Sequence, residues 1–332
     1  MKLHKLTFAF VLVALLGIGA IATLPASARV VAEGTFERTL AVTGPVDLGV
    51  KTGSGSISVR AGEAGRVRVV GTIKVHSNWG ISRGDAEEKV RRLKSDPPIE
   101  QTGNTIRIGK IEDRDLRQNV SISYEIIVPR ETQLSTHSGS GGQTIEGLKG
   151  PVQAETGSGS IKVSDIGGEV NAETGSGSID ASDIGGRLVA GTGSGSIRAT
   201  GIAGAARAST GSGSVRLELV TPGEVEVETG SGSVEVTGLR GALRVDTGSG
   251  SITVDGTPTG NWKLSTGSGG ISLTFPEGAA FELNASTSSG RIYSGHPILV
   301  QGEIGKRELR GKVRGGGVLV AVSTGSGNIR IY

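Results

Sequence analysis

The chain has 332 residues, of which 57 are glycine and only ten are aromatic, and its formal net charge is +3. A compact globule of this length would use more aromatic side chains, so the core must be thin and lined by small aliphatic residues. Alternation of Val and Ile with polar residues excludes a disordered chain, and the absence of cysteine excludes a disulfide framework and a lipoprotein anchor.

Residues 1–28 are predicted to be a signal peptide. Lys2 and Lys5 precede the apolar run Leu6–Leu24, and ASA at Ala26–Ala28 provides a small-residue cleavage pattern. Because the run approaches the length of a membrane span, an uncleaved anchor is the alternative, and it would be the chain's one contact with a membrane. Cleavage leaves 33 basic against 32 acidic residues, a balance that argues against nucleic acid as a partner.

Residues 29–135 are predicted to form an N-terminal β region with one short helix. VDLGVKTGSGSISV at Val46–Val59 already has the pattern of one coil of a repeat. The helix is expected at about residues 82–94, before two prolines that would stop it. Its apolar residues share one face: Ala86, Val90 and Leu93. Such a helix could cap the open end of a β stack, which otherwise invites aggregation.

The phrase TGSG occurs nine times in the chain. Between Thr156 and Thr266, successive copies lie 18 or 19 residues apart, and self-similarity at a fixed period is the signature of stacked repeats. The inward positions of Val152–Thr156 are even-numbered, whereas those of Ile161–Val163 are odd-numbered. An uninterrupted strand could not bury both sets, because its side chains alternate between two faces.

The phrase is therefore predicted to be a corner that shifts the register by one residue. Gly157 and Gly159 permit it, because glycine accepts positive φ and close backbone approach. Serine hydroxyls are expected to bind the backbone groups freed there. A second parity shift falls at Ser164–Asp165, and its downstream equivalents tolerate a left-handed backbone: Asp183, Gly201 and Gly238.

These patterns predict an all-β fold: a single-chain, β-helix-like β-solenoid of ~18-residue repeats over residues 136–332, with an irregular C-terminal end. A flattened barrel or a sandwich of short hairpins is the structural rival. The spacing from Thr287 to Thr324 is 37 residues, close to two periods, so a degenerate coil is expected between them.

Four segments occur in a characteristic order: FERTLAV...GSGSISV, SYEIIVPRETQLSTHSGSG, the serial TGSGSI units, and GGGVLVAVSTGSGNIRIY. As a set they resemble the bacterial putative-adhesin family, over nearly all of the chain that follows the signal. The resemblance implies a repetitive β-solenoid-like fold and an extracytoplasmic location. It implies no catalytic or binding residues.

No constellation for catalysis, cofactor binding or metal binding emerges from the sequence. The repeated serines, such as Ser158, have Thr rather than Gly two residues before them, unlike a hydrolase elbow. No TGSG copy carries the lysine of a P-loop. The three histidines beyond the signal fit no recognisable arrangement: His76, His137 and His296.

Two acidic pairs at equivalent positions of neighbouring repeats are candidate sites. Asp165 and Asp183 would stack, but their next equivalents are glycines, so turn formation is favoured over a Ca²⁺ site. Glu155 and Glu173 would stack on the outward face, where solvated charge is the ordinary expectation. A carbohydrate-active enzyme would place such acids in a groove.

Aromatic residues and threonines give no stronger site. Sugar stacking needs exposed aromatic rings, whereas Trp79 falls in an irregular stretch and Trp262 is equivalent to the core positions Val225 and Leu243. The threonines of the repeats are predicted to point inward and form internal ladder bonds, which argues against binding of ice or another lattice.

The sequence thus favours a non-enzymatic, secreted or envelope-associated structural or adhesive module. Its expected location is the periplasm, the cell surface or the medium. Its expected partners are envelope or extracellular polysaccharide or a surface protein, bound through many weak contacts along a rigid face. A carbohydrate-active enzyme on a solenoid scaffold is the alternative.

Overall fold

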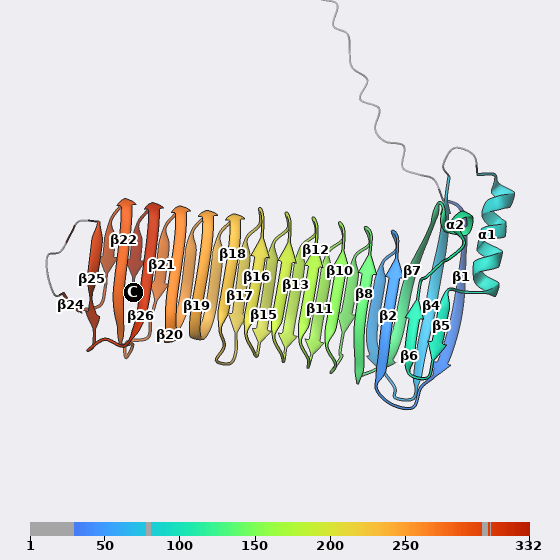
Figure 1. Ribbon diagram of the computed structural model, residues 1–332, viewed down its shortest axis with the longest axis horizontal. Helices are drawn as coiled ribbons and strands as arrows, with labels where there is room; N and C mark the ends of the chain where they lie inside the picture. The colour runs from blue at the N-terminus through green and yellow to red at the C-terminus, as the bar shows by residue number, and fades with distance from the viewer. Residues whose placement is uncertain (1–29, 78–80, 301–304, 306) are drawn as a thin grey trace, which may run out of the picture.

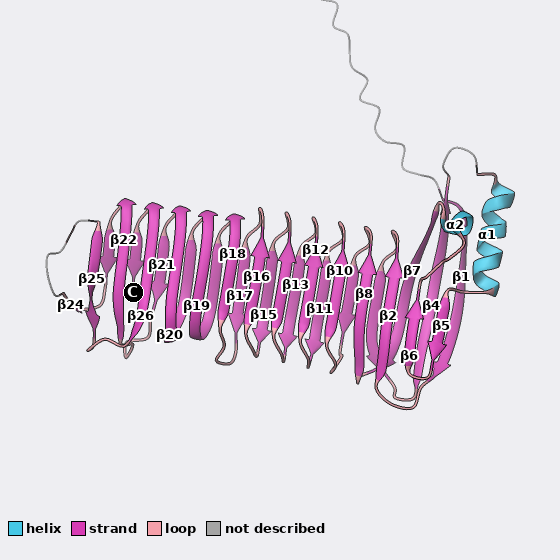
Figure 2. Cartoon of the chain, viewed as in Figure 1, coloured by secondary structure: helices cyan, strands magenta, loops and turns pink. Residues whose placement is uncertain are grey.

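The computed structural model describes residues 30–77, 81–300, 305 and 307–332, and these form one elongated stack of strands (Figure 1). The predicted signal peptide and Trp79 lie outside the described residues. Strands dominate the described chain, with two helices at the N-terminal end of the stack (Figure 2). The predicted all-β class is confirmed.

The elements of the N-terminal part are β1 (Val30–Ala41), β2 (Val46–Thr52), β3 (Ile57–Gly62), β4 (Arg66–His76), α1 (Arg83–Ser95), β5 (Ile99–Thr102), β6 (Thr105–Ile108), α2 (Arg114–Arg117) and β7 (Val120–Pro129). The middle of the stack contains β8 (Thr132–Ser138), β9 (Gln143–Glu146), β10 (Val152–Thr156), β11 (Ile161–Ile166), β12 (Val170–Thr174), β13 (Ile179–Ile184), β14 (Leu188–Thr192), β15 (Ile197–Ile202), β16 (Ala206–Thr210) and β17 (Val215–Leu219). The C-terminal part contains β18 (Val225–Ser231), β19 (Val234–Ser249), β20 (Ile252–Ser268), β21 (Ile271–Thr274), β22 (Phe281–Ser289), β23 (Ile292–Ser294), β24 (Ile298–Leu299), β25 (Glu308–Val313), β26 (Val318–Ser326) and β27 (Ile329–Ile331).

The strands of successive coils pair in parallel and in register, which confirms the solenoid and rules out the hairpin sandwich. Val152 of β10 pairs with Val170 of β12, and Ile161 of β11 pairs with Ile179 of β13. Two ladders result. Ladder 1 runs β6–β2–β8–β10–β12–β14–β16–β18–β19–β20–β26–β22–β25. Ladder 2 runs β1–β4–β7–β3–β9–β11–β13–β15–β17–β19–β20–β21–β27–β23.

The core is a thin layer of aliphatic side chains between the ladders. Val152 and Ala154 from ladder 1 and Ile161, Val163 and Ile166 from ladder 2 are all buried. The predicted parity is therefore confirmed. Burial of one Val or Ile stabilises the fold by about 1.5–3 kcal/mol, so the few inward residues of one coil cannot offset the entropy of ordering about 18 residues. The coils are stable only as a stack.

The TGSG corner differs from the prediction in two details. Gly157 and Gly159 do not adopt positive φ. Glycine is needed instead because neighbouring coils approach closely: a Cβ on Gly159 would lie 2.1 Å from the carbonyl oxygen of Gly141. The hydroxyls that bind this backbone come from the residue before the first glycine of each corner, which is threonine in the TGSG copies and Ser138 in one coil, rather than from the serines inside the phrase. Thr156 Oγ1 donates to the Gly141 oxygen at 3.1 Å and accepts from the Gly159 amide at 3.2 Å.

The second corner is as expected. Asp165 and Asp183 are left-handed, with φ of 53° and 56°, and so are Gly201 and Gly238, with φ of 68° and 70°. Asp and Gly tolerate this conformation, which lets the chain bend just before the buried isoleucine, Ile166 in the first of these coils.

The predicted helix is α1, which begins after the N-cap Ser82 and buries its three expected apolar residues. It packs on β1 and β4, at the end of ladder 2. The one-turn helix α2 was not anticipated. Its N-cap Asp113 pairs with Arg92 of α1 at 3.0 Å, and the backbone amide of Leu116, together with Arg92, holds the pKa of the Asp113 carboxyl below its usual value.

The C-terminal end corrects one expectation. The described residues between Thr287 and Thr324 form no degenerate coil: β23 pairs with β27, and β24 pairs antiparallel with β25. Instead, Thr324 of β26 pairs with Thr266 of β20 on one side and with Thr287 of β22 on the other. The last coil is thus inserted between two earlier ones. β25 pairs antiparallel with β22, and the two-residue strand β24 pairs with the other side of β25.

Candidate functional site

A long groove follows the outer face of ladder 1, beside the TGSG corners. It consists of two adjoining hollows of about 700 Å³ and 600 Å³ that share Thr192 and Ser209. We call it the threonine-edge groove. It crosses eight successive strands, about 34 Å at ~4.8 Å per strand.

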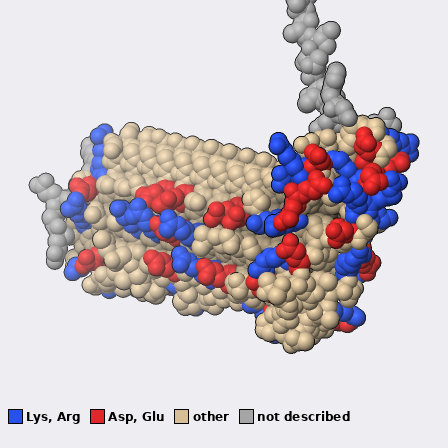
Figure 3. Space-filling view, turned by 45° about the vertical axis from the view of Figure 1, so that its right-hand side comes forward, with Lys and Arg blue, Asp and Glu red and all other residues tan. Residues whose placement is uncertain are grey.

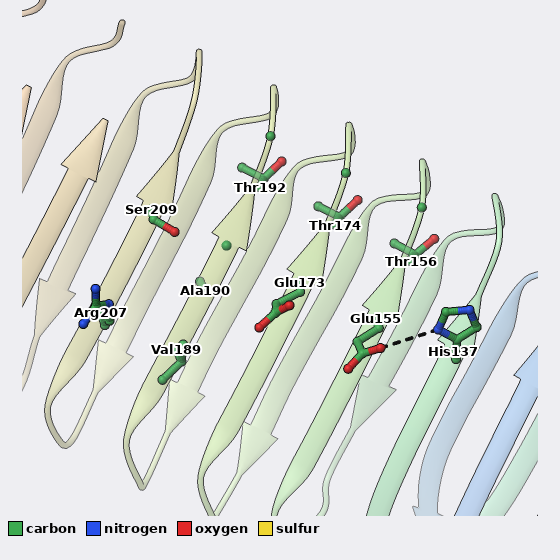
Figure 4. A pocket seen from close by; sticks show the side chains of 14 residues that line it. His137, Glu155, Thr156, Glu173, Thr174, Val189, Ala190, Thr192, Arg207 and Ser209 are labelled. Carbon is green, nitrogen blue, oxygen red and sulfur yellow. Dashed lines mark ion pairs between the residues drawn. The ribbon is translucent and has the colours of Figure 1, made fainter. Parts of the chain in front are cut away.

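The position just before each corner lines this groove. One residue per coil projects from it, in the order His137, Glu155, Glu173, Gly191, Ser209, Glu228, Asp246 and Ser265. Figure 4 shows His137, Glu155 and Glu173 side by side on neighbouring strands. Gly191 and Ser209 place small side chains at two adjacent positions of this column.

Acidic groups dominate the charge of the groove. His137 Nδ1 lies 3.5 Å from a Glu155 carboxylate oxygen, and the Gln153 amide donates to the other oxygen at 2.8 Å. Glu173 and Glu228 form no ion pair with any described residue. Two carboxylates in the groove thus lack a nearby cation.

Arg207 lies where the two hollows meet, and Arg244 lies two strands further along ladder 1. Arg207 Nη1 is 2.9 Å from a Glu226 oxygen, and Arg244 bridges Glu226 and Asp246, with nitrogen–oxygen distances of 3.8 Å and 2.6 Å. Figure 3 shows such charged side chains in rows along the stack, beside a broad band without charges. The groove therefore offers four carboxylates, the hydroxyls of Ser209 and Ser265, and the guanidinium group of Arg207.

The acidic pair and the three histidines named from the sequence do not come together in one site. Glu155 and Glu173 stack and face outward, as predicted, and they also line a groove. The three histidines have unrelated surroundings: His76 lies 3.0 Å from the Ser121 hydroxyl, His137 pairs with Glu155, and His296 packs near Phe275 and Phe281.

The remaining candidates are structural residues. Asp165 forms an ion pair with Arg130, whose Nη2 lies 2.9 Å from Asp165 Oδ2. Trp262 is buried, and its indole nitrogen donates to the Gly241 oxygen at 2.9 Å, which confirms its core assignment. Within the described ranges, His, Asp and Glu side chains do not gather in threes as a metal ion would require.

The groove itself is not among the features predicted from the sequence. The signal was the residue before each TGSG, which reads Glu, Glu, Gly, Ser, Glu, Asp, Ser from Glu155 to Ser265. Gly191 and Ser209, in the middle of this series, line the part of the groove where the two hollows adjoin. That meaning emerges only once these positions are known to form one outward column.

Comparison with known proteins identifies the repeat. Residues 169–332 match the family described as Toastrack DUF4097. The chain carries a Toastrack DUF4097 domain. The family resemblance inferred from the sequence is thus confirmed, and the coils before residue 169 continue the Toastrack pattern in register.

Several solved structures are similar to this Toastrack chain. One, described as a putative lipid binding protein from Parabacteroides distasonis, is 17% identical, with 90% of this chain and 96% of that chain covered and a TM-score of 0.40. A putative adhesin from Parabacteroides merdae is 10% identical, with 90% and 96% covered and a TM-score of 0.35. A putative cell adhesion protein from Clostridium sporogenes is 12% identical, with 90% and 99% covered and a TM-score of 0.28.

No curated protein matches the sequence. Among the helices of the described residues, none has the length and apolar character needed to span a membrane.

Proposed function

We propose that this Toastrack protein is a non-catalytic adhesive module that works outside the cytoplasm and binds an extended polysaccharide in the threonine-edge groove. The observation that carries the proposal is the groove's continuity over eight equally spaced strands. A repeating polymer can meet one outward position at each step, four of the eight being carboxylates, and many weak contacts on one rigid face add up. The predicted signal peptide supports the location.

The groove favours binding over chemistry. Glu155 is half-exposed and Glu173 exposed, so both carboxylates are solvated. Glycosidases depend on surroundings that give their two carboxyl groups different acidities, usually by partial burial of one of them. In the open groove neither Glu155 nor Glu173 is buried.

Filling the groove tests the proposal. A Cβ on Gly191 would meet only Ser209 and Glu173 at 3.6 Å and 3.8 Å, ordinary contact distances, so Gly191→Phe should fold normally and obstruct the floor. Thr144→Phe is the matched control, because Thr144 is exposed on ladder 2, away from the groove.

The measurement is binding of chain 29–332 to fractionated envelope and extracellular polysaccharides. We expect Gly191→Phe to weaken binding at least about tenfold, a loss of about 1.4 kcal/mol, while the control binds normally. Absence of binding to every polysaccharide would refute the adhesive role and leave a scaffold. Binding to a surface protein alone, unaffected by Gly191→Phe, would place the site elsewhere.

The stacked pair in the groove keeps a carbohydrate-active enzyme as the second candidate, because that hypothesis requires clustered acids in a groove. A polysaccharide-degradation screen with Glu155→Gln and Glu173→Gln separates the two. Degradation that either change abolishes would overturn the non-catalytic assignment.

A further inference from the structure

The last coil of the chain occupies a slot between two coils that precede it in the sequence. β26 pairs in parallel with β20 on one side and with β22 on the other, and β27 pairs in the same way with β21 and β23. Figure 1 shows β26 lying between β20 and β22. Since β20, β21 and β22 follow one another along the chain, the slot exists only because the C-terminal coil fills it.

The two walls of this slot match each other. Trp262 of β20 and Leu283 of β22 both pair with Val320. Likewise, Thr266 and Thr287 both pair with Thr324. Because all three strands are parallel, withdrawal of β26 would let β22 dock on β20 in the ordinary register of the solenoid. The stack can therefore exist with the C-terminal coil either inserted or released.

The hydrogen bonds at the TGSG corner of the inserted coil are equivalent to those of the coils on either side. Thr324 donates to the Gly269 oxygen at 2.9 Å, and Thr287 donates to the Gly327 oxygen at 3.0 Å. Each bond joins a threonine to the glycine of the coil below, as elsewhere in the stack. Any coil of this type satisfies the donors and acceptors of any neighbour, so the slot does not require that its occupant come from the same chain.

The segment that leads into the inserted coil is built as a hinge. Residues 314–317 carry the chain across β22, from β25 on one side to β26 on the other. Arg314, Gly315, Gly316 and Gly317 all have positive φ, from 48° to 154°. Three glycines in a row leave the direction of the exit weakly fixed, because glycine has a wide choice of backbone angles.

We propose that the slot between β20–β21 and β22–β23 is a docking site for the C-terminal coil, residues 318–332, of a second copy of this chain. An exchanged coil makes the same contacts as the chain's own coil, so exchange costs only the association entropy and the change at the hinge. Copies that each fill the slot of the next would form an open row of stacks rather than a closed dimer. The inference does not depend on polysaccharide binding.

Because the chain has no cysteine, a disulfide can report the exchange. Ser265 of β20 and Ser323 of β26 are directly paired and lie on the outer face. Two full-length variants, Ser265→Cys and Ser323→Cys with tags of different mass, are refolded together and then oxidised. A disulfide-linked heterodimer forms only when the C-terminal coil of one copy enters the slot of the other.

The matched control pairs Ser323→Cys with Ser209→Cys, which lies on the same face but does not pair with β26. The double variant Ser265→Cys/Ser323→Cys in one chain should give an internal disulfide, which shows that the fold and the disulfide geometry are sound.

We expect the Ser265→Cys and Ser323→Cys mixture to give at least about fivefold more heterodimer than the control, and a yield that rises with protein concentration by mass action. A yield equal to the control at every concentration, with the internal disulfide forming normally, would overturn the proposal.

Discussion

The buried hydroxyl at each corner should be worth far more to stability than its small size suggests. Thr174 is 6% exposed; its Oγ1 donates to the Gly159 oxygen at 2.8 Å and accepts from the Gly177 amide at 3.1 Å. Thr174→Val keeps the shape but leaves two backbone groups without partners. At ~1–2 kcal/mol for each lost bond, we expect destabilisation of about 2–4 kcal/mol.

The controls separate the hydroxyl from the methyl group and from the general effect of a substitution. Thr174→Ser keeps both hydrogen bonds and loses one methyl group, at a cost of about 1 kcal/mol. Thr144→Val changes an exposed residue on ladder 2 and should stay within about 0.5 kcal/mol of the unmodified chain.

The assay is urea unfolding combined with hydrogen exchange of the amides in residues 170–192, because a repeat stack need not unfold as one unit. Thr174→Val should lower the unfolding midpoint and speed exchange around its own coil. If Thr174→Val proved as stable as Thr174→Ser, the threonine hydroxyls would contribute nothing to the stability of the stack, contrary to this prediction.

Coupling between neighbouring corners offers a sharper check. Thr192 donates to the oxygen of Gly177, the residue whose amide donates to Thr174. Thr174→Val/Thr192→Val should therefore deviate from additivity by at least about 0.5 kcal/mol. Thr174→Val/Thr210→Val, whose Thr210 bonds Gly195 instead, should be nearly additive.

Three further predictions follow from the packing. A Cβ on Gly177 would lie 1.9 Å from the Gly159 oxygen, so Gly177→Ala should lower the free energy of unfolding in urea by at least about 4 kcal/mol. A Cβ on Gly53 would have no heavy atom within 4 Å, so the control Gly53→Ala should be nearly neutral. Burial raises the pKa of Tyr124 far above its usual value. The native state therefore keeps the phenol proton at a pH where the unfolded chain loses it, and the free energy of unfolding should fall by about 1.4 kcal/mol per pH unit above ~10. Tyr124→Phe should remove this contribution from the alkaline unfolding curve. His296 Nε2 is buried and has no hydrogen-bond partner among the described residues, so His296→Phe should raise the thermal midpoint by the equivalent of about 1–2 kcal/mol. A lower midpoint would show that the nitrogen is satisfied in solution.

The sequence alone determined the local design of each coil. The period, the inward and outward parity, the two corners and the left-handed positions at Asp165 and Asp183 are set by residues close together in the chain. Such features follow from backbone sterics and strand alternation, which do not depend on which coil lies alongside. The helix at 82–94 was predictable for the same reason, because its cap and its apolar face are local.

Only the tertiary structure decided what lies next to what. The coil of β2 and β3 lies beside β8 and β9, and β26 lies between β20 and β22, although long stretches of chain separate each from its neighbours. The need for glycine at Gly159 also comes from the coil beneath it rather than from its own φ. The threonine-edge groove likewise requires eight strands in register. Since every coil presents the same ladder of donors and acceptors, the repeat pattern fixes how coils stack but leaves their order at the ends to the connecting segments.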